Sequence, residues 1–190
     1  MKALFTTLII GSLLAGCTSL PPSPMPSRDK VGDFALEARF ALRVSLPEQP
    51  PQSSGGRLSW THKNGDNHVL LSSPLGYGMA EIDTTPVLSR LRTGDGKTHE
   101  SSDPETLIEE VTGQRLPITP LPAWLLGRAN HSAQIERDER LRPTRLHEDG
   151  WQIDYTYDDE TPGALPARLT LRRDQEIELR LRIEEWKESP

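Results

Sequence analysis

Residues 34–46 read FALEARFALRVSL, and this stretch decides the fold. Apolar side chains recur at every second position from Phe34 to Leu46, and charged or small residues alternate with them. A period of two places all the apolar side chains on one face of a β-strand, whereas a helix would spread them around its circumference. The stretch therefore predicts a long strand with one apolar face and one solvated face.

Alternation or strand-like apolar runs of this kind recur along most of the chain. Asn64-Gly65 is a strong hairpin signal, because both central residues of a type I′ turn have positive φ. Trp186 breaks the last alternation and indicates a bulge or a strand end, while the breaker-rich residues 50–56 predict a loop. The further strands predicted are residues 58–62, 68–73, 77–83, 87–92, 133–137, 142–148, 151–157, 168–172 and 177–184.

Two short segments predict helices instead. In the first, Ser102-Asp103-Pro104-Glu105 supplies a cap residue and a first-turn proline, and Gly113 is a natural stop. The second spans about residues 121–126 and is closed by Gly127. The pattern predicts a mainly β fold, a strongly curved antiparallel sheet with short helices on its apolar face. Such a sheet can be filled by side chains or can enclose an apolar ligand, and alternation does not decide between the two.

Charge and cysteine content exclude several classes of function. The chain has 22 Lys and Arg against 28 Asp and Glu, a net charge of -6, which argues against a nucleic-acid partner. A single Cys excludes an internal disulfide and a Cys-based zinc site. We expect no cofactor.

The N-terminus has the pattern of an export signal. A positive start is followed by an apolar run that is too short to span a bilayer and ends in Leu14-Ala15-Gly16-Cys17. This ending resembles the lipobox of bacterial lipoprotein precursors, which implies cleavage after residues 1–16 and a lipid on Cys17. Cleavage at an A-x-A-type site to give a periplasmic protein without lipid is the alternative. Thr18 in place of Asp suggests the outer membrane, and residues 17–32 form a Pro-rich tether.

A search for catalytic chemistry finds little. No nucleophile elbow, phosphate loop or dinucleotide motif occurs, and adjacent acidic pairs on a strand point to opposite faces. His62 and His68 face each other across the Asn64-Gly65 hairpin in one interpretation and would hold a metal; ordinary polar strand residues are the alternative.

The turn Ser73-Pro74-Leu75-Gly76 carries an apolar residue where polar residues are usual. Leu75 either folds back onto the core or projects, and on a tethered domain a projecting Leu enters a lipid surface. Trp60, Trp124 and Trp151 similarly allow either core packing or the lining of a ligand cavity.

Several short motifs occur together in a specific order. Each motif alone is weak evidence of a family, and the order and spacing of the set are specific. Besides the lipobox at Cys17 they are residues 34–39, Trp60, Ser73 to Gly76, Gly113, residues 121–127 (LPAWLLG), Gly150-Trp151, Leu165-Pro166 and Trp186. In this order the chain resembles the LolB family over about residues 33–186.

The resemblance implies an unclosed antiparallel β-barrel, residues 33–190, with helices covering an apolar cavity for acyl chains. It implies an outer-membrane protein without enzymatic activity that accepts lipoproteins from the periplasmic carrier LolA and inserts them into the outer membrane. Leu75, between Pro74 and Gly76, would promote delivery into the membrane. We expect a monomer, with a cavity lined by alternating residues, namely Phe40, Leu42, Trp60, Trp124, Trp151, Tyr155 and Leu181.

Two departures and one rival function remain. Ala38 precedes Arg39 where the family usually has Gly, and only Ser27 to Gly32 remain for an N-terminal helix, which is short or absent. The rival is a structural or assembly lipoprotein whose sheet binds a protein partner and encloses no ligand. A cavity in the structure separates the two functions.

Overall fold

The computed structural model describes residues 25–129 and 132–189. The predicted signal residues 1–16, the lipidation site Cys17 and most of the tether lie outside the described residues. No helix in the described part is both long and apolar enough to cross a membrane.

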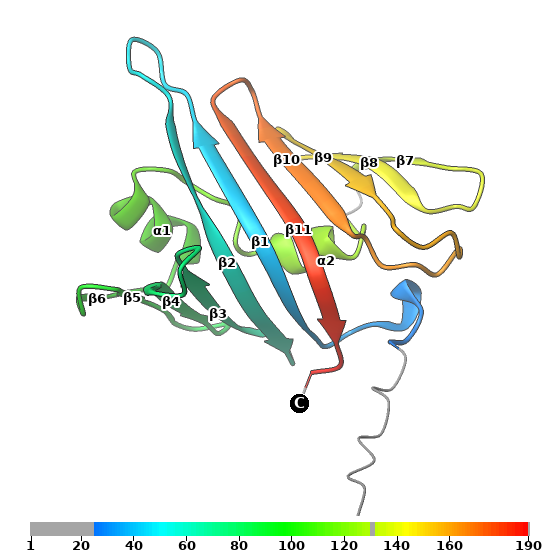
Figure 1. Cartoon of the computed structure of the whole chain (residues 1–190), viewed down its shortest axis with the longest axis horizontal. Coiled ribbons are helices and arrows are strands. Elements are labelled where there is room, and N and C mark those ends of the chain that lie inside the picture. Colours follow the sequence, from blue (N-terminus) through cyan, green and yellow to red (C-terminus); the bar gives the residue numbers. More distant parts are fainter. Residues whose placement is uncertain (1–24, 130–131, 190) are drawn as a thin grey trace, which may run out of the picture.

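Eleven antiparallel strands form one sheet in the order β6-β5-β4-β3-β2-β1-β11-β10-β9-β8-β7 (Figure 1). Within the described residues the edge strands β6 and β7 do not pair with each other, so the curved sheet is unclosed, as expected. The strands are β1 (Phe34–Val44), β2 (Gln52–Lys63), β3 (Asp66–Ser72), β4 (Gly78–Thr84), β5 (Ser89–Thr93), β6 (Thr98–Ser101), β7 (Gln134–Arg137), β8 (Pro143–Glu148), β9 (Trp151–Thr156), β10 (Arg168–Arg173) and β11 (Ile177–Lys187).

The predicted alternation sets the face of each strand. In β1, Phe34, Leu36 and Ala38 are buried while Arg39 is exposed. Register carries this pattern across the sheet, because Leu36 lies opposite Trp60 and Trp60 opposite Val69. The apolar rows form the concave face, and α2 passes behind β1 and β11 in Figure 1.

Strand β2 begins earlier than the sequence predicts. The loop predicted at residues 50–56 is wrong for its second part, because Gln52 to Gly56 pair with β1. Gly55 and Gly56 read as loop residues, yet a Cβ on Gly55 would lie 2.9 Å from the carbonyl oxygen of Phe40 and one on Gly56 only 2.0 Å from that of Ser72. Here glycine allows close backbone approach within a strand.

The hairpin at Asn64-Gly65 is confirmed, with φ of 53° and 88°. The irregularity predicted at Trp186 is also present. The register of β11 against β1 shifts by one residue, between Ile183 and Glu185. After this bulge Trp186 lies opposite Leu36, stacks edge-on to Phe34 at 5.4 Å between ring centroids, and donates a hydrogen bond from Nε1 to the Pro166 carbonyl.

Both predicted helices form. α1 (Pro104–Thr112) is capped by Asp103 rather than by Ser102, since the Asp103 carboxylate accepts from the backbone N–H groups of Glu105 and Thr106. Gly113 ends the helix in the left-handed conformation, at φ 71°. α2 (Leu121–Leu125) is about one and a half turns long and is largely buried. Among residues 25–33, the part before β1 that the structure describes, a short 3₁₀ helix, η1 (Arg28–Lys30), is the one helical element, as the limited length there predicts.

Candidate functional site

An apolar cavity of about 300 Å³ lies between the concave face of the sheet and the α1 side of the molecule. Its walls come from β1 to β5 and β11, and its roof from α1 and residues 113–121. Only three of its lining residues are polar, Ser54, Thr93 and Thr112. The apolar lining residues are Phe40, Leu42, Leu58, Trp60, Val69, Leu71, Met79, Ala80, Ile82, Leu91, Ile108, Leu116, Ile118, Leu121, Leu179 and Leu181.

Four of the seven residues predicted to line a cavity do so: Phe40, Leu42, Trp60 and Leu181. Sequence reasoning missed Val69, Leu71 and Ile82. The alternation of β3 and β4 carried the signal for them, because these residues continue the rows of Trp60 and Leu58 across the sheet.

The prediction is wrong for Trp124, Trp151 and Tyr155, which do not line this cavity. Trp124 is fully buried in α2, its ring lies 6.3 Å from that of Trp151, and its carbonyl accepts a 2.8 Å hydrogen bond from the Tyr155 hydroxyl. Its Nε1 donates to Glu148 Oε2 at 2.6 Å. These side chains fill the space under α2, so they are core residues.

A polar ladder extends from Trp60, which lines one end of the cavity. Trp60 Nε1 donates to Asn67 Oδ1 at 3.0 Å, and Asn67 Nδ2 donates to Thr84 Oγ1 at 2.9 Å. His62 joins the ladder, with Nδ1 2.8 Å from Asn67 Oδ1. Asn67 and Thr84 are buried, so these hydrogen bonds offset the cost of placing polar groups beside an apolar cavity.

His62 and His68 do not face each other, so the structure favours the alternative in which they are ordinary polar strand residues. His62 lies opposite Asn67, and His68 lies opposite Thr61 on the outer face, because neighbouring strand positions point to opposite sides. Within residues 25–129 and 132–189, His68, Glu81 and Asp83 are the one group whose ligand atoms lie close enough to hold a metal. His68 contacts Asp83 at 2.6 Å and Glu81 pairs with Arg92 at 3.0 Å, so all three already have partners.

The other end of the cavity is open. Exposure of the lining residues rises in this direction: Trp60 and Ile82 are buried, Leu42 is half-buried, and Met79 at the start of β4 is 38% exposed. Met79 follows the turn that joins β3 to β4. That turn therefore lies at the mouth of the cavity.

Leu75 projects from this turn and is 84% exposed. The turn is held from within, because the Gly76 N–H donates to the Ser73 carbonyl at 2.9 Å and the Ser73 N–H to the Tyr77 carbonyl at 2.8 Å. Gly76 takes a φ of 89°, which glycine adopts without strain. The fold-back alternative for Leu75 is wrong, and Tyr77 beside it is 73% exposed.

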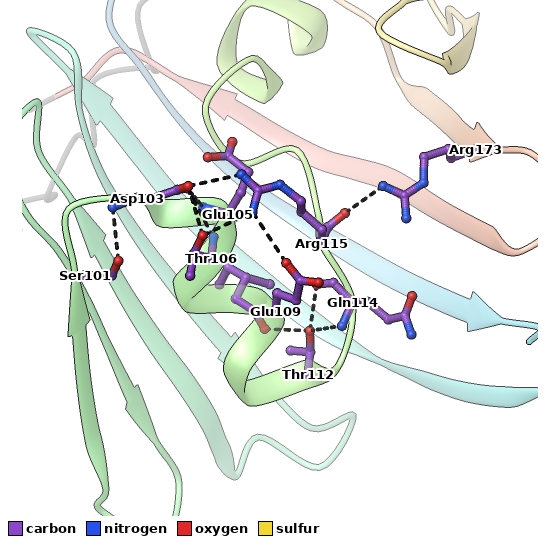
Figure 2. A network of polar contacts seen from close by, with 10 residues as sticks. Ser101, Asp103, Glu105, Thr106, Glu109, Thr112, Gln114, Arg115 and Arg173 are labelled. Carbon is purple, nitrogen blue, oxygen red and sulfur yellow. Dashed lines mark hydrogen bonds and ion pairs between the residues drawn. The ribbon is translucent and has the colours of Figure 1, made fainter.

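A network of polar contacts holds the roof of the cavity in place (Figure 2). Arg115, in the segment after α1, pairs with the capping carboxylate of Asp103 at 3.1 Å and with Glu109 at 3.4 Å. Its carbonyl accepts a hydrogen bond from Arg173 of β10 at 3.2 Å. Hydrogen bonds from Thr106, followed by that from Arg115, hold the pKa of Asp103 well below its ordinary value. The polar contacts that hold the roof are therefore exposed.

A family model described as "Outer membrane lipoprotein LolB" matches residues 32–186. The chain belongs to the LolB family. An "Outer-membrane lipoprotein LolB" of Dechloromonas aromatica is 67% identical over the full length of both chains. One of Bordetella petrii is 31% identical, covering 84% of this chain and 81% of its own. A crystal structure of a LolA superfamily protein from Nitrosomonas europaea has a TM-score of 0.49 at 13% identity, covering 83% of this chain and 86% of that one.

Proposed function

We propose that this chain is an outer-membrane lipoprotein, anchored by a lipid on Cys17, that accepts lipoproteins from the carrier LolA and inserts them into the outer membrane. The cavity is the observation that carries the proposal. Its apolar walls suit hydrocarbon chains, and membership of the LolB family supports a role in lipoprotein transport.

The physical task requires a sheltered route. Each methylene moved from hydrocarbon into water costs about 0.8 kcal/mol, so an acylated lipoprotein does not cross an aqueous space unprotected. Transfer between apolar sites forms no covalent bond, which is consistent with a site built from aliphatic and aromatic side chains. Its direction follows from affinities that rise from the carrier to this receptor and then to the membrane.

The volume of the cavity indicates how cargo enters. About 300 Å³ is at the lower end of the range for drug-sized ligands, and several long acyl chains need more. The roof therefore has to move away from the sheet when cargo enters. Its fixing contacts at Asp103 and Arg115 are exposed and exchange readily with water, so displacing the roof leaves few polar groups unsatisfied.

The position of the turn accounts for delivery. Leu75 projects beside the open end of the cavity, so the same end that releases acyl chains presents an apolar side chain to the bilayer. The proposed lipid on Cys17 holds the domain at the membrane surface. These features together make a receptor that needs no external energy source.

A transfer assay tests the function. Carrier loaded with a labelled lipoprotein is mixed with vesicles bearing the full chain, and the label that enters the vesicles is measured over time. We expect rapid, chain-dependent transfer, and cells depleted of the chain should accumulate lipoproteins in the periplasm. Normal outer-membrane lipoprotein levels after depletion, or equal transfer to bare vesicles, would contradict the proposal.

A further inference from the structure

Four arginines lie side by side across the outer face of the sheet. Arg57 of β2 is the register partner of Arg39 of β1, Arg39 is that of Arg182 of β11, and Arg182 is that of Arg168 of β10. Figure 1 shows these four strands next to one another, with α2 on the far side. We call this set the arginine row.

All four side chains point to solvent. Each arginine is exposed, and the neighbouring strand residues Ala38, Leu58, Leu169 and Leu181 are buried on the concave face. Adjacent strands are about 4.8 Å apart, so the row spans about 14 Å. In a chain of net charge -6, such a concentration of cations is not a consequence of composition.

The row is only half neutralised. Arg39 pairs with Glu184 at 2.6 Å and Arg168 with Asp158 at 3.1 Å. Within the described part of the chain, neither Arg57 nor Arg182 has an ion pair or a side-chain hydrogen bond. Like charges directly opposite each other destabilise a sheet, so this arrangement has a cost that the two ion pairs offset only in part.

The row begins at the base of the Leu75 turn. Arg57 is the register partner of Ser72, the residue before that turn, and both line a groove of about 600 Å³ on the outer face. Beyond Ser72 the chain presents two exposed apolar side chains, Leu75 and Tyr77. Cations next to an exposed Leu and Tyr are the combination that binds the interface of an anionic bilayer.

We propose that the arginine row is a docking surface for the phosphate groups of anionic phospholipids in the membrane that carries this chain. Guanidinium groups bind phosphate oxygens in a bidentate manner, and Arg57 and Arg182 have that capacity free. Docking orients the domain so that the Leu75 turn meets the bilayer. The proposal rests on the proposed lipid anchor, since a tether of eight residues from Cys17 to Met25 reaches at most about 29 Å and keeps the row close to the membrane.

The test uses the full lipidated chain in vesicles. Cys17 is the only cysteine and is acylated, so an Ala41→Cys substitution, exposed on β1 beside the row, takes a fluorophore alone. A quencher attached to lipid headgroups then reports how closely the outer face approaches the bilayer. The vesicles contain phosphatidylcholine alone or with a third of phosphatidylglycerol, at low and at high salt.

We expect phosphatidylglycerol to increase quenching and high salt to remove the increase. Arg57→Gln with Arg182→Gln should lower the ratio of docked to free domain by about tenfold, whereas the matching Lys pair should retain most of it. The control pair is Arg90→Gln with Arg140→Gln, which removes the same charge from ion pairs elsewhere and should change nothing. The Gln pair should melt no lower than the parent chain, because it relieves like-charge contacts.

Quenching that is equal in the two kinds of vesicle, or equal for the two Gln pairs, would overturn the proposal. So would unchanged quenching together with weakened binding of an acidic protein, which would assign the row to a protein partner. The quenching assay contains neither carrier nor cargo. Loss of docking in vesicles therefore stands apart from loss of lipoprotein transfer, which the transfer assay measures with the same variants.

Discussion

The two halves of the sheet have the same alternating sequence pattern but different interiors. Strands β2 to β5 face α1 across a cavity of about 300 Å³, whereas β8 to β10 pack directly onto α2. Leu146, Ile153 and Leu171 in that second half are fully buried, while Leu71 and Met79 in the first are not.

The difference lies in what each helix contributes. α2 inserts the indole of Trp124, the largest fully buried side chain, while α1 contributes the smaller Leu107 and Ile108. α1 is also held by exposed polar contacts at Asp103 and Arg115, whereas Trp124 hydrogen-bonds to the buried Glu148. Stability is concentrated in the α2 half, and space for a ligand in the α1 half.

The largest effect is expected at Trp124. Trp124→Ala should lower the free energy of unfolding by about 3–5 kcal/mol, because it empties a filled core and removes the donor to Glu148. Phe40→Ala, a partly buried aromatic residue beside existing space, should cost clearly less. Denaturant unfolding of both variants measures the difference. Equal costs would contradict the division into a filled half and a hollow half.

Adding volume provides the converse test. Leu171→Trp should destabilise the protein by about 1–3 kcal/mol, because it overpacks a fully buried site. Leu71→Trp, the same change in the cavity wall, should leave thermal stability nearly unchanged and block cargo acceptance. A Leu71→Trp variant that accepts cargo at the normal rate would argue against the cavity as the binding site.

A smaller effect is expected at the roof, and it depends on pH. The pKa of Asp103 is lowered in the folded state, so its stabilising contribution is present above its ordinary pKa near 4 and is lost as the pH falls below that value. Asp103→Asn should lower the melting temperature by a few degrees between about pH 8 and pH 5, and the difference should shrink below about pH 4.

Glu110→Gln is the control for this variant, since it removes the same charge from an exposed position of α1. It should melt like the parent chain throughout. A pH-independent difference for Asp103→Asn would show that the carboxylate charge does not stabilise the roof.

The smallest effect on stability is expected at Leu75. Leu75→Glu should leave folding and cargo acceptance intact and slow delivery to membranes severalfold, because a charge replaces the exposed apolar side chain at the cavity mouth. Val87→Glu is the matched control, because Val87 is 78% exposed in the turn at the other end of β4. If both variants deliver cargo at the same rate, the position of Leu75 at the cavity mouth does not determine the rate of delivery.

Sequence alone predicted most of the sheet, because a period of two marks both a strand and its buried face. It missed β6, whose residues Thr98 to Ser101 are polar, and the start of β2, where glycines pair closely with β1. Both segments form strands through their neighbours in the sheet, and periodicity does not report those contacts.

The candidate site was predicted less completely, for a related reason. Alternation shows that Phe40, Trp60, Tyr155 and Trp151 face inward, but not which helix lies above each of them. Tyr155 and Trp151 contact Trp124 of α2, while Phe40 and Trp60 line the cavity. The direction in which Leu75 points depends on the conformation of its turn. The sequence of the turn is compatible both with a Leu75 that folds back onto the core and with one that projects.

Site-specific cross-linking of bound cargo tests the central claim most directly. A photoreactive phenylalanine derivative replaces either Phe40 in the cavity wall or Tyr155 under α2, and each chain is loaded with lipoprotein before illumination. The account predicts that cargo acyl chains cross-link at position 40 and not at position 155. Cross-linking at position 155, or at neither position in a chain that transfers cargo, would contradict it.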